Sequence, residues 1–308
     1  MHVMIFGAGY SGKAIANALK TKAASVRGTT RSEDKFANLA AAGMTPLLFD
    51  GAHLDDDLIA AMGNVTHLVQ SIAPGKDGDP LLTLLGGDLK KRLPNLKWAA
   101  YLSTVGVYGD HDGAWVDETT PCRPVSARSV ERVAAEAAWT EAAQKADVPL
   151  SILRLSGIYG PGRNTFMNFE KGTARRLVKK DQVFNRIRVE DIGAALAFLT
   201  QKNERGIFNV TDDEPCPPQD VVSFAADLMG VVPPAEQDFE TADLTPMARS
   251  FYGENKRVSN AKIRELGFDF RFPEYRQSLR QLWENDSGAV ENNSAKNDEK
   301  SIQYRFGG

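Results

Sequence analysis

The sequence is poor in the residues that build metal centres and disulfide frameworks. Its 308 residues include only two cysteines, Cys122 and Cys216, and four histidines. Neither cysteine has a second metal ligand at the usual spacing, and the histidines form no cluster, so we predict no metal site. Two reduced thiols are the simpler interpretation of the cysteines, and a disulfide between them is the alternative.

Long apolar runs and an excess of one charge are also missing. No run of about 18 apolar residues occurs, which speaks against a membrane-spanning helix. Lys plus Arg number 37 and Asp plus Glu 40, for a net charge of -3, so nucleic acid and membrane surfaces are not expected as partners. No basic region precedes the apolar stretch Val3–Gly7, so the sequence predicts no signal peptide. This favours a cytoplasmic protein.

The composition that is present is typical of a globular protein with a sizeable core. Hydrophobic residues make up 42% of the chain and charged residues 25%, both ordinary for a globular protein. Helical patterns, clearest at 13–20 and 130–144, alternate with short apolar runs. These runs lie at 3–6, 24–27, 45–49, 65–72, 98–103 and 150–155. Such alternation predicts an α/β fold with a doubly wound parallel sheet.

The pattern changes after Gly160–Gly162. Helices are predicted around 192–199 and 217–230, with a strand at 206–210 between them, and we expect these elements to form a smaller lobe at the end of the sheet. The predicted division is a core over 1–160, then the remaining sheet elements and the small lobe over 161–284. A polar, disordered tail is predicted over 285–308.

The first strand and helix are joined by a glycine-rich turn, GAGYSG at residues 7–12, that matches G-x-G-x-x-G. Its place between a strand and an amphipathic helix favours dinucleotide binding over a turn with chance glycines. Gly7 would allow the tight turn, Gly9 the close approach of a pyrophosphate, and Gly12 the packing of helix on strand. Main-chain amides, including those of Tyr10 and Ser11, would hold the anion with the helix dipole. The turn predicts a Rossmann fold.

The end of the second strand predicts which dinucleotide is bound. NAD-selective folds usually place Asp or Glu there, whereas this chain reads RGTTRS over 27–32. Arg31 suits a 2′-phosphate, and Thr30 and Ser32 add hydroxyls. We therefore predict NADP(H), with NAD as the other possibility and a solvated arginine as the alternative. By fold analogy, the adenine and ribose would pass Asp50, Ile72, Ala73 and Pro74.

Further motifs follow in order along the chain. They are LSTVGVYG at 102–109, RLSGIYGPG at 154–162, NRIRVEDI at 185–192, FNVTDDEP at 208–215 and the segment 260–268. Together with the glycine turn, they resemble the extended short-chain dehydrogenase/reductase superfamily, in its NAD-dependent epimerase/dehydratase group. The resemblance implies a Rossmann domain with a small substrate-binding lobe and, often, nucleotide-sugar or related polar substrates. It also suggests a homodimer through the helix at 130–146, as in many relatives.

The resemblance implies a reaction centre of Ser/Thr, Tyr and a Lys four residues after the Tyr. Thr104 fits the first position, but no tyrosine occurs between Tyr108 and Tyr159. Alignment on Glu136 places Arg128 at the Tyr position and Arg132 at the Lys position. Arginine stays protonated, so Arg128 cannot exchange a proton, while Arg132 could still bind the ribose. Loss of a positioned acid/base costs ~10²–10⁴ in rate, so we expect an atypical member.

Other side chains near these motifs are candidates for the reaction or the substrate. His111 follows Thr104 in a loop and has a pKa of ~6.5 when unperturbed, which suits proton transfer; a solvated loop histidine is the alternative. Converging arginines favour a phosphate or carboxylate substrate. The candidate substrate residues are Arg123, Arg128, Tyr159, Arg163 and Arg188. In the alternative interpretation, Arg154 and Arg186 brace the fold and Tyr159 packs in it.

The sequence as a whole favours an atypical NADP(H)-binding oxidoreductase or epimerase-like enzyme. Its substrate would be small and polar, either sugar-like or anionic. A protein that binds the dinucleotide without catalysis and reports redox state to a partner is the alternative, because the tyrosine is missing. A reactive Cys122 thiolate is less favoured than an inert thiol.

Overall fold

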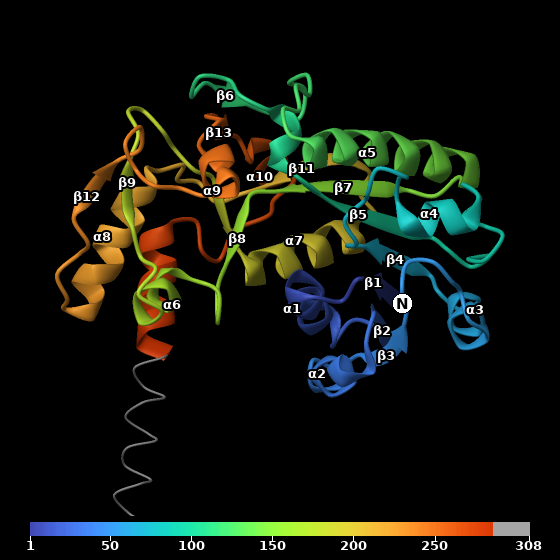
Figure 1. Cartoon of the computed structure of the whole chain (residues 1–308). Coiled ribbons are helices and arrows are strands. Elements are labelled where there is room, and N and C mark those ends of the chain that lie inside the picture. Colours follow the sequence, from blue (N-terminus) through green and yellow to red (C-terminus); the bar gives the residue numbers. More distant parts are fainter. Residues whose placement is uncertain (286–308) are drawn as a thin grey trace, which may run out of the picture.

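The structure, a computed structural model, describes residues 1–285. At its centre is a seven-stranded parallel sheet in the order β11-β7-β5-β4-β1-β2-β3 (Figure 1). The strands are β1 (His2–Phe6), β2 (Ser25–Thr30), β3 (Thr45–Leu48), β4 (His67–Gln70), β5 (Trp98–Thr104), β7 (Leu150–Leu155) and β11 (Gly206–Val210). The predicted doubly wound α/β fold is confirmed. The predicted tail lies outside the described residues, except for residue 285.

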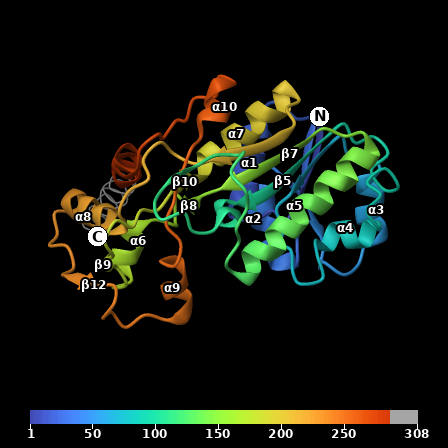
Figure 2. The same ribbon diagram turned by 90° about the horizontal axis from the view of Figure 1, so that it is seen from above.

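Helices cover both faces of this sheet (Figure 2). The helices on one face are α1 (Tyr10–Leu19), α2 (Phe36–Ala41) and α7 (Val189–Lys202). Those on the other face are α3 (Asp56–Met62), α4 (Pro80–Leu85) and α5 (Ala127–Ala146). Each layer buries its own hydrophobic cluster against the sheet, which is why β1, β5 and β7 are apolar on both faces.

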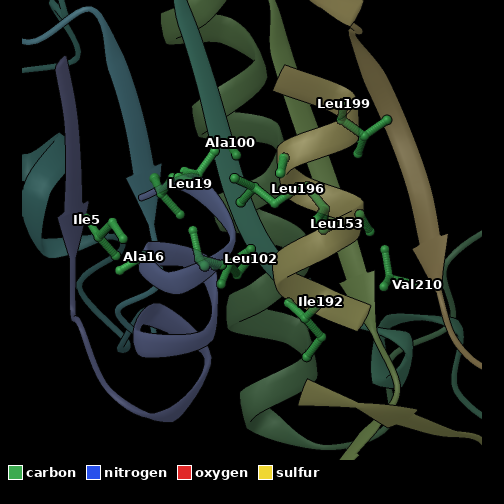
Figure 3. Close-up of a cluster of buried hydrophobic side chains, with 14 of the residues drawn as sticks. Ile5, Ala16, Leu19, Ala100, Leu102, Leu153, Ile192, Leu196, Leu199 and Val210 are labelled. Carbon is green, nitrogen blue, oxygen red and sulfur yellow. The ribbon is translucent and has the colours of Figure 1, made fainter. Parts of the chain in front are cut away.

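The close packing of α1 and α7 shapes the first layer. Leu19 of α1 and Ile192, Leu196 and Leu199 of α7 meet β-strand side chains there (Figure 3). Gly193 brings the two helices together, because a Cβ at this position would lie 2.5 Å from the main-chain oxygen of Ala14. The contact fixes α1, whose first residues follow the glycine turn.

The prediction that 192–199 and 206–210 belong to the smaller lobe is wrong. Helix α7 lies on the main sheet, and β11 pairs with β7 from Gly206–Ser151 to Val210–Leu155 as the sheet's edge strand. Both elements have the type that their patterns predict. Their place was missed because a local pattern does not reveal which distant strand a segment pairs with.

The smaller lobe lies beyond the carboxyl end of β7 and contains short elements. They are α6 (Thr165–Glu170), α8 (Pro218–Met229), α9 (Pro246–Phe251), β8 (Gly157–Tyr159), β9 (Arg176–Val178), β10 (Arg186–Arg188), β12 (Glu236–Asp238) and the helical residues 275–285. β10 pairs with β8 and β12 with β9. Phe166, Val221, Tyr275 and Leu279 form part of its core.

The remaining elements are short strands and helices. They are β6 (Trp115–Val116), β13 (Arg257–Val258), α10 (Ala261–Glu265) and the 3₁₀ helices Glu33–Lys35 and Val105–Tyr108. β6 pairs with β13. No helix among residues 1–285 is both long enough and apolar enough to span a membrane.

Candidate functional site

The glycine-rich turn lies at the carboxyl end of β1, where the sheet changes direction. From β1 the chain runs to β2 and β3 on one side, then crosses to β4 on the other. Ligands of open α/β sheets bind in the crevice at such a switch point. Hydrogen bonds from the amides of Gly7 and Ala8 to Thr29 fix the turn against β2, at 3.0 and 2.9 Å.

The three motif glycines have the geometry that the motif predicts. Gly7 has a φ of +79°, and a Cβ there would lie 2.8 Å from Ile72 Cγ1. A Cβ on Gly12 would lie 3.3 Å from Ile5 Cγ2, so Gly12 allows α1 to pack on β1. Gly9 differs, because its Cβ would meet only the Gly7 oxygen, at 4.0 Å. The protein alone therefore gives no steric reason for Gly9, and the space beside it suits a ligand.

The amino terminus of α1 has no side-chain cap. Gly9 is the N-cap residue, no side chain accepts from the first-turn amides, and the first turn carries no acidic residue. Such an end is electrostatically complementary to an anion. The turn and the helix end together fit the pyrophosphate of a dinucleotide, and the predicted ligands Tyr10, Ser11 and Gly12 would offer their amides to it.

The end of β2 presents a basic side chain at the same edge of the sheet. Arg31 is exposed, and the preceding Thr30 ends β2. The Ser32 hydroxyl donates to the carboxylate of Asp34, so this predicted ligand is engaged locally. The Thr30 hydroxyl lies 3.5 Å from the Ser32 carbonyl oxygen.

The other predicted cofactor residues follow β3 and β4. The Asp50 carboxylate accepts from the amides of Ala52 and His53 at 2.7 and 2.8 Å. The His53 side chain, followed by these amides, lowers the pKa of Asp50 to about 2. Ile72 touches the glycine turn, and Ala73 and Pro74 follow it in the same loop.

A buried polar pair that was not predicted from the sequence supports this loop. The Gln70 side-chain amide donates to both carboxylate oxygens of Asp79 at 2.9 and 2.8 Å. Asp79 also caps α4 by accepting from the amides of Leu81 and Leu82, each at 3.0 Å. The pattern D-P before an apolar helix is a recognisable helix start, but its partner on β4 has no local signal.

The predicted reaction centre lies at the end of β5 and the start of α5. Thr104 ends β5, is half-buried, and accepts from the Gly106 amide at 3.2 Å. Arg128 is exposed in the first turn of α5, which contains no tyrosine. The Arg132 guanidinium donates to the Tyr101 hydroxyl at 3.1 Å and to the Leu102 carbonyl at 2.7 Å. Arg132 is thus held against β5, and its role toward a ribose stays a prediction.

His111 is fixed within its own loop. Its Nε2 lies 3.1 Å from the Tyr108 carbonyl oxygen, and its amide donates to Asn255 at 3.0 Å. A carbonyl only accepts, so Nε2 carries a proton and only Nδ1 is left for proton exchange. Its catalytic role stays a prediction.

Two of the motif arginines are structural. Arg154 donates to Glu136 from Nε and Nη2 at 3.1 and 2.7 Å, and both side chains are buried. The prediction that Arg188 binds substrate is wrong. Its side chain is fully buried, and Nε, Nη1 and Nη2 all donate within the protein. The acceptors are Glu190, Ser278 and Gln281.

A cavity of about 360 Å³ opens beside the segment that follows β8. Its cations are Arg163, Lys171 and Arg186. The other lining residues are Tyr159, Gly162, Asn164, Thr165, Met167, Asn168, Val221, Tyr275 and Leu279. Of the predicted substrate residues, Tyr159 and Arg163 line it, and Arg123 and Arg128 do not.

Two ionisable groups beside the cavity, Tyr159 and Asp212, have raised pKa values. Burial raises the pKa of Tyr159, and the nearby Asp212 raises it further, so the phenol is neutral. Burial likewise raises the pKa of Asp212 well above its ordinary value, although Arg186 opposes the shift. Neutral Tyr159 beside Arg163, Lys171 and Arg186 suits an anion with polar groups.

Four polar cavity residues were not predicted from the sequence: Asn164, Asn168, Lys171 and Tyr275. The first three directly follow the GPG motif, so reading the motif further would have suggested them. Tyr275 belongs to the helical residues 275–285, and no sequence signal links this helix to the segment that follows the GPG motif. Both cysteines are free thiols, and burial raises the pKa of Cys122, as expected for an inert thiol.

The fold, the switch-point turn and the uncapped helix define a doubly wound protein of the dinucleotide-binding type. Comparison with known families matches residues 89–210 to the NAD dependent epimerase/dehydratase family. The chain belongs to this family, in which NAD(P) binding is typical.

Individual relatives cover nearly the whole chain. A functionally unknown conserved protein from Silicibacter pomeroyi DSS is 46% identical, with a TM-score of 0.84, over 92% of this chain and 99% of its own. Protein YeeZ of Escherichia coli K12 is 27% identical over 88% of this chain and 96% of its own. The human epimerase family protein SDR39U1, solved with NADPH, has 18% identity and a TM-score of 0.71, over 92% of this chain and 100% of its own.

Proposed function

We propose that this protein binds NADP(H) and acts as an atypical oxidoreductase or epimerase-like enzyme on a small anionic substrate. The observation that carries the cofactor assignment is the exposed Arg31 at the end of β2, on the edge of the sheet that holds the uncapped α1 terminus. An arginine there pairs with a 2′-phosphate, whereas a carboxylate would pair with ribose hydroxyls.

The substrate assignment rests on the cavity. Three cations line it, and no carboxylate stands among its lining residues. Asparagine and threonine side chains add donors, so a phosphate or carboxylate with polar substituents fits it. Thr104, at the carboxyl end of β5, would hydrogen-bond the reacting oxygen. The nicotinamide, when bound, supplies or accepts hydride; the chain's part is to orient the two reactants.

Calorimetry with NADPH and NADH tests the cofactor proposal. We expect NADPH to bind at least tenfold more tightly than NADH. Arg31→Ala should weaken NADPH binding by about 10- to 100-fold, the worth of a charge-assisted hydrogen bond, and leave NADH unchanged. Lys35→Ala, which removes an exposed cation from the neighbouring 3₁₀ helix, is the matched control. Equal affinities for both dinucleotides, or equal losses in both variants, would refute the assignment.

A second candidate is a non-catalytic dinucleotide sensor. It is favoured by α5, where the first turn has an exposed Arg128 and no tyrosine, and where Arg132 is hydrogen-bonded to β5. Mixing the protein and NADPH with aldehydes, ketones and nucleotide sugars, while following nicotinamide absorbance, separates the two candidates. Turnover with any of these substrates favours the enzyme; tight NADPH binding without turnover across the panel favours the sensor. A homodimer through α5 stays a prediction.

A further inference from the structure

Tyr10 connects two sites that the sequence separates by 150 residues. Its main chain belongs to the first turn of α1, where the dinucleotide pyrophosphate is proposed to bind. Its side chain points to a different segment: the hydroxyl donates to the Pro161 carbonyl oxygen at 3.0 Å. Pro161 lies in the turn Gly160–Arg163, which we call the bridging turn.

The bridging turn is a rigid part of the cavity wall. Gly160 and Arg163 exchange main-chain hydrogen bonds of 2.9 and 3.0 Å. The Asn164 side chain donates to the Gly160 oxygen at 3.1 Å and accepts from the Met167 amide at 3.2 Å, which joins the turn to α6. Gly162, Arg163, Asn164 and Met167 all line the cavity. A shift of the bridging turn therefore moves the cavity's donors.

The contact between Tyr10 and this turn is close on several sides. The Arg163 guanidinium lies 5.9 Å from the centre of the Tyr10 ring. Gly160 has a φ of +151°, and a Cβ there would lie 2.8 Å from the Tyr10 hydroxyl oxygen. Burial raises the pKa of Tyr10, with Glu190 as a further cause, so the hydroxyl remains a donor at neutral pH.

A second set of contacts links Gly160 to another part of the cavity wall. The same Gly160 Cβ position lies 3.3 Å from Arg188 Nε. Arg188 donates to Ser278 Oγ at 2.8 Å and Gln281 Oε1 at 2.8 Å. Both acceptors belong to the helical residues 275–285, whose Tyr275 and Leu279 line the cavity.

We propose that Tyr10 couples the dinucleotide site to the cavity, so that binding at one site strengthens anion binding at the other. This rests on the proposed function, because a dinucleotide must bind at the α1 terminus. A pyrophosphate held by the first amides of α1 orders the main chain of Tyr10. The side chain then holds Pro161 and Arg163 in place, and an anion in the cavity does the same from the other side. Each ligand orders residues that the other also needs to be ordered, so the second ligand to bind loses less conformational entropy.

Calorimetry with NADPH and inorganic phosphate tests the coupling on the intact chain. In the wild type, saturating NADPH should tighten phosphate binding by about fivefold or more. By reciprocity, phosphate should tighten NADPH binding by the same factor. Lys171→Gln removes an exposed cavity cation that has no contact with Tyr10; it should abolish phosphate binding and show that the phosphate lies in the cavity.

Tyr10→Phe keeps the ring beneath Arg163 and removes only the hydroxyl. We expect the coupling in this variant, taken as the ratio of its own NADPH affinities with and without phosphate, to fall below twofold. Tyr108→Phe, which loses a hydroxyl bond of 2.7 Å to Asn209 on β11, is the matched control and should keep the coupling. NADPH binding without coupling in the wild type, or coupling that survives Tyr10→Phe, overturns this inference alone. Phosphate that weakens NADPH binding also overturns it, and absence of NADPH binding overturns the proposed function with it.

Discussion

At the scale of single residues, the arginines separate into those used inside the fold and those that face a ligand site. Arg154 and Arg188 donate to buried acceptors, whereas Arg163 lines the cavity and Arg31 is exposed. All but Arg31 occur in or beside the same motifs, so sequence position could not separate them. What separates them is the presence of a buried acceptor, such as Glu136, from a distant element.

The Arg154–Glu136 pair leads to a prediction about stability. Glu136→Gln leaves the buried Arg154 charge without its counter-ion, so we expect a loss of about 3–5 kcal/mol in the free energy of unfolding. Glu136 also accepts from the Ser103 hydroxyl at 2.6 Å, and the glutamine oxygen can still accept this bond, so the loss reports on the ion pair. Urea denaturation followed by circular dichroism measures the change.

The same helix offers a control. Glu141 and Lys145 form an exposed pair at 2.6 Å, and an exposed pair contributes little because water screens it. Glu141→Gln should therefore leave the urea midpoint nearly unchanged. Equal shifts for the two variants would show that burial does not decide the strength of these pairs.

At the scale of elements, the strands of the first half were predictable because they are buried on both faces. The runs at 98–103 and 150–155 coincide with β5 and β7 to within a residue, and helix 130–144 is the centre of α5. The helix at 192–199 and the strand at 206–210 were predicted with the right type but assigned to the lobe, whereas the helix at 217–230 does lie there as α8. The pairing of β11 with β7 joins residues about 55 positions apart, and such long-range pairing leaves no trace in a local pattern.

The contact between α1 and α7 gives a prediction at this scale. Alanine normally favours a helix over glycine by about 1 kcal/mol, but the Gly193 Cβ would lie 2.5 Å from a main-chain oxygen of α1. A main-chain atom cannot turn away, so Gly193→Ala should separate the helices and destabilise the protein by about 1–3 kcal/mol. Thermal unfolding monitors the loss as a lower Tm.

Gly63 provides the matched substitution. It lies in helical conformation at the end of α3, with only an ordinary 3.5 Å contact to the Ala60 oxygen. Gly63→Ala should therefore be neutral or stabilise by about 0.4–1 kcal/mol. An unchanged or higher Tm for Gly193→Ala would mean that α1 and α7 can move apart without cost.

At the scale of the whole molecule, the sheet and the lobe meet around β8, β10 and the helical residues 275–285. The glycine turn and the GPG motif were predicted from sequence because their backbone geometry demands glycine at fixed spacing. The cavity between lobe elements was predicted only in part. Its walls come from the bridging turn, α6, β10, α8 and residues 275–285, and the last of these carries no motif. A site assembled from distant segments needs the fold before its residues can be named.

Arg188 joins the last described helix to the body of the protein. It is fully buried, its guanidinium lies 4.2 Å from the centre of the Phe272 ring, and it donates to Ser278 and Gln281. The side chain introduced by Arg188→Gln is too short to reach these two acceptors, which are then left without a donor. We expect amide hydrogen exchange over 275–285 to accelerate by about 10- to 100-fold, the loss of about 1.5–3 kcal/mol of charge-assisted hydrogen bonding. Amides of β5, buried in the sheet, should keep their protection.

Arg276→Gln on the same helix shows whether this effect belongs to the buried connection. Arg276 is partly exposed and pairs with Glu214 within the lobe, so its loss should change exchange over 275–285 by no more than a few fold. If Arg188→Gln instead accelerates exchange equally in β5, the arginine stabilises the sheet as a whole. If neither region changes, the helix is held by the apolar contacts of Tyr275, Leu279 and Leu282 alone. The contacts that link Gly160 through Arg188 to this helix then do not contribute to coupling.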